Sequence, residues 1–229
     1  MEHKINYLKK YHKDVEIVQD GFDGIENLPT SWKQFLNLSS TSDRINTVMS
    51  IWDKVAGKCL SNTILYLKRN LKNVELITYG GKYSLLYSVA SKNGEILYYE
   101  GGNPLDHQLI NELENYWKKF PETVQNFYQD LHNGFTYYAS GSMGLYSKCD
   151  ILYLGDEYWE IVEGREDSLE IQLESAFGFF GNGMGVYVVL DALNCKDDNA
   201  TLWYTSKLPR YHIKFWDIID EWIVIGFEA

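Results

Sequence analysis

The sequence predicts a globular protein that combines helices with strands, and three patterns support this fold class. Apolar residues recur at helical spacing between residues 120 and 135, directly after a proline that suits the first turn of a helix. Between residues 74 and 98 the pattern changes to aromatic and branched side chains around an Asn-Gly pair, which indicates a hairpin of strands. Residues 215–223 then show the amphipathic pattern of a C-terminal helix.

The stretch from 120 to 135 is expected to be a short helix with one buried face. Pro121 has the fixed φ and missing N–H of a first helical turn, and Glu122 follows where the helix dipole favours an acid. Asn133-Gly134 is expected to end the helix, because glycine accepts the left-handed conformation that follows a last turn. His132 is expected to have a structural role there, as a cation or through a hydrogen bond. The apolar stripe consists of Val124, Phe127, Tyr128 and Leu131.

Residues 1–103 are expected to form helices followed by a β-hairpin. A short helix within residues 4–20 should lead into a strand at 15–18, and a second proline-started helix is expected at 28–36. Helical spacing continues from 44 to 70 with a break at Gly57, and Asn93-Gly94 then joins two strands. The Gly-Gly-Asn-Pro stretch at 101–104 is the predicted boundary to a second unit, residues 104–229.

In residues 104–229 we expect a helix at 105–117, the helix at 120–135, several short strands and the terminal helix. The strands are predicted at 151–154, 170–174, 186–190 and 202–204. Residues 177–185 are interpreted as a glycine-rich turn. They lack the Lys-Ser/Thr pair of a phosphate-binding loop and precede a strand, whereas dinucleotide-binding loops lead into a helix.

The net charge of −11 belongs to the second half of the chain. Residues 1–103 hold 13 Lys and Arg against 11 Asp and Glu, whereas residues 104–229 hold 8 against 21. Nucleic acids and anionic membranes are poor partners for such a surface, because contacts with phosphate need Lys and Arg. A basic protein partner is allowed by this charge.

The cysteines and histidines give no indication of a metal or redox site. Cys59, Cys149 and Cys195 are odd in number and widely spaced, which is typical of reduced thiols in a cytoplasmic protein. The five histidines lack ligand spacing, so no metal or cofactor is predicted. The N-terminus has no apolar run of a signal peptide, and no stretch is apolar for long enough to span a membrane. The oligomeric state is left open.

Carboxylates are densest between residues 156 and 174, a stretch that we call the acidic segment. It contains Asp156, Glu157, Glu160, Glu163, Glu166, Asp167, Glu170 and Glu174, with Arg165 the only base. This pattern fits a solvated face, a recognition surface for a basic partner, or paired carboxylates for acid–base or metal chemistry. Tyr158 and Trp159 favour recognition, because both residue types are enriched at interface hot spots. The predicted partner-binding residues are Asp156, Glu157, Tyr158, Trp159, Glu160, Glu163, Glu166 and Asp167.

Three pieces of the second half, in this order, resemble the SUKH superfamily of bacterial immunity proteins. They are the helix with Pro121, Phe127 and Tyr128 that leads into Asn133-Gly134, the glycine turn and strand at 181–191, and the aromatic helix at 215–222. The resemblance covers residues 104–229 and implies an α+β fold, in which helices pack against a twisted, mostly antiparallel sheet. It leaves open whether residues 1–103 fold separately or extend that sheet.

The resemblance also implies a function without catalysis, in which the protein neutralises a cognate toxin domain, such as a basic nuclease, by covering its active site. Two alternatives stay open. One is an intracellular regulatory scaffold of the same fold, and the other is a hydrolase that uses the carboxylates of the acidic segment.

Overall fold

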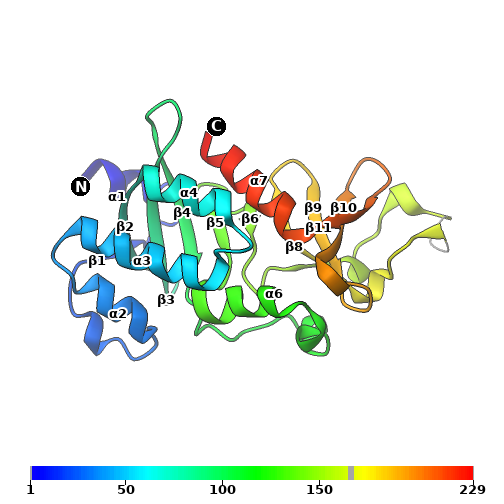
Figure 1. Ribbon diagram of the computed structural model, residues 1–229, viewed down its shortest axis with the longest axis horizontal. Coiled ribbons are helices and arrows are strands. Elements are labelled where there is room, and N and C mark those ends of the chain that lie inside the picture. Colours follow the sequence, from blue (N-terminus) through cyan, green and yellow to red (C-terminus); the bar gives the residue numbers. More distant parts are fainter. Residues whose placement is uncertain (1, 165–167, 229) are drawn as a thin grey trace.

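The computed structural model describes residues 2–164 and 168–228, and it shows an α+β protein built on one large sheet. All strand pairs of this described part are antiparallel. Helices α3, α4 and α7 lie across one face of the sheet (Figure 1). The strands are β1 Glu16–Val18, β2 Leu71–Tyr79, β3 Lys82–Ala90, β4 Ile96–Gly102, β5 Phe135–Tyr137, β6 Met143–Leu145, β7 Leu152–Tyr153, β8 Ala176–Asn182, β9 Val186–Asp191, β10 Asn199–Tyr204 and β11 Arg210–Lys214. The helices are α1 Glu2–Leu8, α2 Thr30–Leu36, α3 Thr41–Ala56, α4 Ser61–Asn70, α5 Asn111–Glu114, α6 Glu122–Asn126 and α7 Phe215–Glu228.

The strands follow one another almost in chain order across the sheet, from β1 to β11, with β7 paired to β8 off this path. Strand β4 lies before the predicted boundary at residues 103–104 and β5 lies after it. The two pair directly, with Tyr99 opposite Tyr137. Residues 1–103 therefore add their strands to the same sheet as the rest of the chain.

Alternate side chains of each strand enter different cores, because neighbouring residues of a strand point to opposite faces. On β3, Leu85 and Tyr87 join the main core under the helices, whereas Leu86 packs with the N-terminal segment. On β9, Val188 joins the main core and Val189 faces away from it. We call the face opposite α3, α4 and α7 the second face of the sheet.

A chain of hydrogen bonds runs through the main core and ends at His132. Trp52 Nε1 on α3 donates to the Tyr87 hydroxyl at 3.0 Å, and that hydroxyl lies 2.8 Å from Nε2 of His132. Since the Tyr87 oxygen accepts from Trp52, its own hydrogen is free to reach His132, and Nδ1 is left to donate to the Gly102 carbonyl at 3.4 Å. A Cβ on Gly101 would lie 2.5 Å from the imidazole ring, so glycine is required beside it.

His132 is therefore buried as a neutral ring. It has no exposed surface, and burial lowers its pKa from 6.5 to about 3. The predicted structural role is confirmed, but the ring bonds Tyr87 of β3 and Gly102 of β4 and not the carbonyls at the end of the helix. The alternative role as a cation at a helix end is wrong, because the site excludes the water that would solvate the charge.

The predicted helix at 120–135 is present but ends earlier than expected. Pro121 precedes α6, and the stripe at Val124, Phe127, Tyr128 and Leu131 is buried as predicted. The last turn, Phe127–Leu131, widens to a π-helical turn that closes with the bond from His132 N to Phe127 O. Gly134 does have a left-handed φ of 87°, but it lies directly before β5, where a Cβ would be 2.7 Å from the Ser147 nitrogen.

Other predicted elements divide into confirmed and wrong ones. The structure confirms the helix at 28–36 and the helical region 44–70 with its break at Gly57. It also confirms the Asn93-Gly94 hairpin and the strands at 186–190 and 202–204. The helix at 105–117 is wrong, since only Asn111–Glu114 is α-helical. The strand at 170–174 is also wrong, and 177–182 belongs to β8 instead of a turn. Among the described helices, none combines the length and apolar character needed to cross a membrane.

Candidate functional site

The acidic segment lies between β7 and β8, on the second face of the sheet. Among its described residues, three short 3-10 turns lie within it or at its ends, η4 Leu154–Asp156, η5 Glu160–Val162 and η7 Leu173–Ser175. A small core of its own holds these turns in place, in which Leu154 and Val162 pack with Val189 of β9 and Trp203 of β10. The backbone that presents the acids is therefore anchored to the sheet by apolar contacts.

The acids themselves point into solvent. Asp156, Glu157, Glu160 and Glu163 are exposed, and Tyr158 between them is 75% exposed. Trp159 is half-buried instead, with its ring 5.2 Å from that of Trp203 and its Nε1 donating to the Leu154 carbonyl at 3.0 Å. Among the predicted partner-binding residues, Trp159 thus holds the turn in place and the five others named here form the exposed surface.

The remaining predicted acids fall into two groups. Glu166 and Asp167, together with Arg165, lie outside the described residues. Glu170 and Glu174 are exposed, and a carboxylate oxygen of Glu170 lies 2.7 Å from Nε2 of His212 on β11. Both side chains of that pair are more than half exposed, so solvent screens it and its contribution to stability is small.

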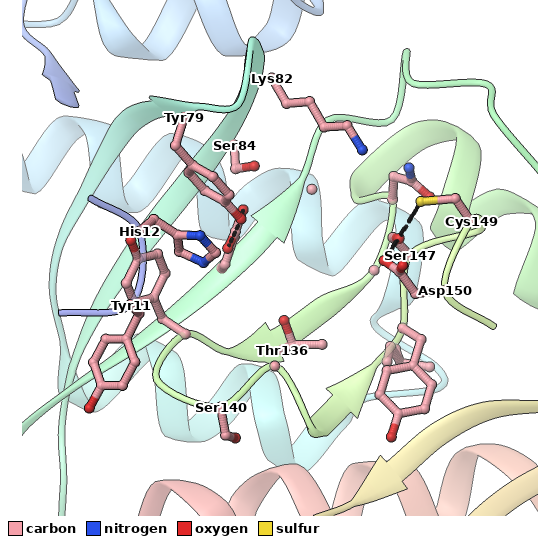
Figure 2. Close-up of a pocket in the computed structure, with 18 of the residues that line it drawn as sticks. Tyr11, His12, Tyr79, Lys82, Ser84, Thr136, Ser140, Ser147, Cys149 and Asp150 are labelled. Carbon is pink, nitrogen blue, oxygen red and sulfur yellow. Dashed lines mark hydrogen bonds between the residues drawn. The ribbon is translucent and has the colours of Figure 1, made fainter. Parts of the chain in front are cut away.

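A polar cleft of about 610 Å³ lies elsewhere on the second face, over β3, β4 and β5. This volume is within the range of small-ligand sites. Figure 2 shows Tyr79 and His12 on one side of the cleft, Thr136 at its base, and Ser147, Cys149 and Asp150 on the other side. The lining side chains with hydrogen-bonding or charged groups are Lys10, Tyr11, His12, Tyr79, Lys82, Ser84, Glu100, Asp106, Asn133, Thr136, Tyr138, Ser140, Tyr146, Ser147, Cys149 and Asp150.

Glu100 of β4 is the central acid of the cleft. The Tyr79 hydroxyl lies 2.8 Å from each of its carboxylate oxygens and donates its one hydrogen to this carboxylate. Desolvation raises the pKa of Glu100, and hydrogen bonds from Ser84 and Tyr79 oppose that effect in part. In the described part of the chain, no Lys, Arg or His nitrogen lies within the 4.0 Å of an ion pair with this carboxylate.

Aromatic rings form one wall of the cleft. His12 stacks on Tyr79 with ring centroids 3.9 Å apart, and Tyr138 meets both rings edge to face. Tyr11 extends this wall through an edge contact with Tyr138 at 6.1 Å. Desolvation raises the pKa of Tyr79 and of Tyr138, so both hydroxyls stay protonated at neutral pH.

The opposite wall is a hydrogen-bonded loop after β6. The Ser147 hydroxyl contacts the Asp150 carboxylate and lies 3.1 Å from the Cys149 sulfur. Among the described residues, no set of three His, Cys, Asp or Glu side chains is placed to hold a metal ion. The lining as a whole offers hydrogen-bonding groups, aromatic rings and charges of both signs, a combination that suits the binding of a ligand.

No pattern in the sequence predicts this cleft. None of the described residues of the acidic segment lines it, and its own residues come from segments that are far apart in the chain. One signal was present, because Glu100 interrupts the aromatic strand that follows the Asn93-Gly94 turn. An acid within such a strand faces either solvent or a polar site, and pattern alone does not distinguish the two.

The chain was compared with models of known protein families, with curated proteins and with solved structures, and none of these comparisons found a match.

Proposed function

We propose that this protein is a cytoplasmic immunity protein of the SUKH type, which binds and neutralises a basic toxin domain through its acidic segment. The observation that carries the proposal is the presentation of Asp156, Glu157, Glu160 and Glu163. All four are exposed on turns that a small apolar core fixes to the sheet. The α+β architecture is consistent with the family that the sequence resembles, and the absence of catalysis is part of the proposal.

The charge arrangement supports recognition more than stability. Exposed carboxylates contribute little to folding, and like charges at close spacing repel one another in the free protein. A basic partner relieves that repulsion and is attracted over a distance, which raises the association rate. Tyr158, at 75% exposure in the middle of the acids, offers the kind of aromatic anchor that interfaces use.

The test begins with the protein encoded by the neighbouring gene, which is the expected toxin. Co-expression should restore growth of cells that this toxin otherwise kills, and the two proteins should co-purify. Replacing Asp156, Glu157, Glu160 and Glu163 by Lys should slow association at least tenfold at low salt, and added salt should slow the unmodified pair.

A matched variant controls for net charge. Asp20, Glu26, Glu95 and Glu114 are exposed acids outside the acidic segment, and their replacement by Lys changes the net charge by the same amount. This control should retain most of the association rate. Equal rates for both variants and the unmodified protein, with no salt dependence, would show that the acidic segment is only a solvated face.

A further inference from the structure

The cleft contains a desolvated carboxyl group, Glu100, and no Lys, Arg or His nitrogen of the described chain lies within the 4.0 Å of an ion pair with it. The Glu100 carboxylate accepts from Tyr79, and its two oxygens offer about four acceptor positions. Desolvation raises the pKa of Glu100, whereas a cation in contact with it favours the charged form. An ion at a site of low polarity interacts more strongly with an opposite charge than one in water does. The best complement for this position is therefore a cation.

The walls of the cleft also suit a cation. Organic cations bind over the faces of aromatic rings, and several rings around one site form an aromatic cage. The rings of Tyr79, Tyr138 and Tyr11 line one side of the cleft, with His12 stacked between the first two. Asp150 lies on the opposite wall (Figure 2), so that a bound cation would have a carboxylate in each direction.

The cleft also contains two lysines that can compete with a cationic ligand. Lys10 and Lys82 are exposed, and Figure 2 shows Lys82 extending into the cleft from its upper edge. Exposed ammonium groups are well solvated and screened, whereas Glu100 is not. His12 and Lys82 interact electrostatically with Glu100 from beyond the distance of an ion pair, so both compete with a cationic ligand for this carboxylate.

We propose that the cleft over β3, β4 and β5 binds an ammonium or guanidinium group, held between Glu100, Asp150 and the tyrosine wall. The group could belong to a free organic cation or to a Lys or Arg side chain presented by another protein. This inference does not rest on the proposed function, because it concerns a different surface and is testable on the isolated chain.

Two probes separate these sources. Agmatine supplies a free guanidinium group, and the capped peptide Gly-Gly-Arg-Gly-Gly supplies the same group on a backbone. The matched peptide with citrulline in place of arginine keeps the shape without the charge. Binding is followed by NMR, through the backbone amide signals of Ser84, Gly102 and Thr136. Saturable shifts are expected with a guanidinium probe, and at least tenfold weaker binding with the citrulline peptide.

Three variants assign the site. Glu100→Gln keeps the shape and an acceptor for Tyr79 but removes the charge, and it should weaken binding about tenfold or more. Lys82→Met removes the competing charge at an exposed position and should strengthen binding several-fold. Glu95→Gln, at the exposed hairpin turn, removes an equal charge away from the cleft and should leave binding unchanged.

The outcomes are distinct. Binding of both guanidinium probes supports a side chain of a partner as ligand, and binding of agmatine alone supports a free cation. Failure of both probes to shift the cleft signals would overturn the inference. Equal binding of the citrulline peptide, or equal binding by Glu100→Gln, would overturn it as well. Since Lys82→Met changes only an exposed side chain, its effect is measurable even if Glu100→Gln does not fold. The lack of any increase in its affinity would then count against the proposal.

Discussion

The burial of His132 links the stability of this protein to pH. Its pKa is about 3 in the folded state because burial disfavours the charged ring, against 6.5 for an unburied histidine. Between these values the unfolded chain binds a proton that the folded chain does not bind. The free energy of unfolding therefore falls as the pH is lowered from 6.5 towards 3, and the full contribution is present above 6.5.

The size of the effect follows from the two pKa values. At pH 5 about 97% of the unfolded chains carry the proton, and the difference in proton binding amounts to about 2 kcal/mol. By pH 3 the loss approaches about 4–5 kcal/mol. Because domains of this kind are stable by roughly 5–15 kcal/mol, the change at pH 5 is easily measured.

The assay is urea unfolding at pH 7.5 and pH 5, for the unmodified protein and for His132→Gln. Glutamine is neutral at both values and keeps one donor and one acceptor for the Tyr87 and Gly102 positions. Carboxylates affect both proteins alike, so that the comparison isolates His132. The unmodified protein should lose about 2 kcal/mol more than the variant on going to pH 5. Equal losses would refute the assignment of a buried neutral ring.

Three further predictions concern packing and charge. Phe127 is 1% exposed, and its ring is in edge contact with that of Trp52 at 6.1 Å. Phe127→Ala should therefore lower the free energy of unfolding by about 3–5 kcal/mol in a denaturant titration. A decrease below about 1 kcal/mol would show that Phe127 is not a core residue. Asp220 of α7 caps α4 by accepting from the backbone nitrogens of Asn62 and Thr63. Asp220→Ala should therefore lower the free energy of unfolding by about 1–3 kcal/mol in the same assay. The control Glu221→Ala, at an exposed position of the same helix, should lower it little. Purified protein should show no nuclease, phosphatase or esterase activity with Mg²⁺ or Zn²⁺, and an activity that Glu157→Gln or Glu160→Gln abolishes would overturn this expectation.

Local patterns predicted the elements that local forces determine. The proline and apolar stripe of residues 121–131, the Asn93-Gly94 turn and the break at Gly57 each depend on neighbours within a few residues. Such signals survive folding because the tertiary contacts reinforce them. The residues of the predicted stripe, among them Phe127 and Leu131 at 1% exposure, are buried in the main core.

The glycines of β8 gave the opposite result, because they serve contacts that are distant in sequence. Gly178 lies against Leu152 of β7, where a Cβ would be 3.2 Å from the Leu152 Cβ, and Gly181 lies under the Tyr146 hydroxyl. Read locally, these glycines indicate a turn. In the fold they let other chain segments approach a strand closely, which is the second common reason for glycine in a sheet.

The region 105–117 shows that apolar spacing can predict burial without predicting backbone conformation. Leu113 is fully buried, and Tyr116 and Trp117 pack against the main core. Only four residues form an α-helix there, and a separate 3-10 turn positions Trp117. Short turns can bury the same side chains as a regular helix, so the spacing does not distinguish them.

The two candidate surfaces lie on the same face of the sheet. Val189 of β9 packs under the acidic segment and Leu86 of β3 packs under the N-terminal segment, both on the second face, while α3, α4 and α7 close the other face (Figure 1). Four strand spacings of about 4.8 Å separate β4 from β9, or about 19 Å along the sheet. A partner footprint of standard size is roughly 30 Å across, so one toxin domain could cover the acidic segment and place a basic side chain in the cleft.

In that case the effects of Glu100→Gln and of the four-site charge reversal on toxin binding would be non-additive, because both act on one docked complex. If the cleft serves a separate small cation, Glu100→Gln leaves toxin binding unchanged, and the same pair of variants thus decides whether the second face carries one site or two.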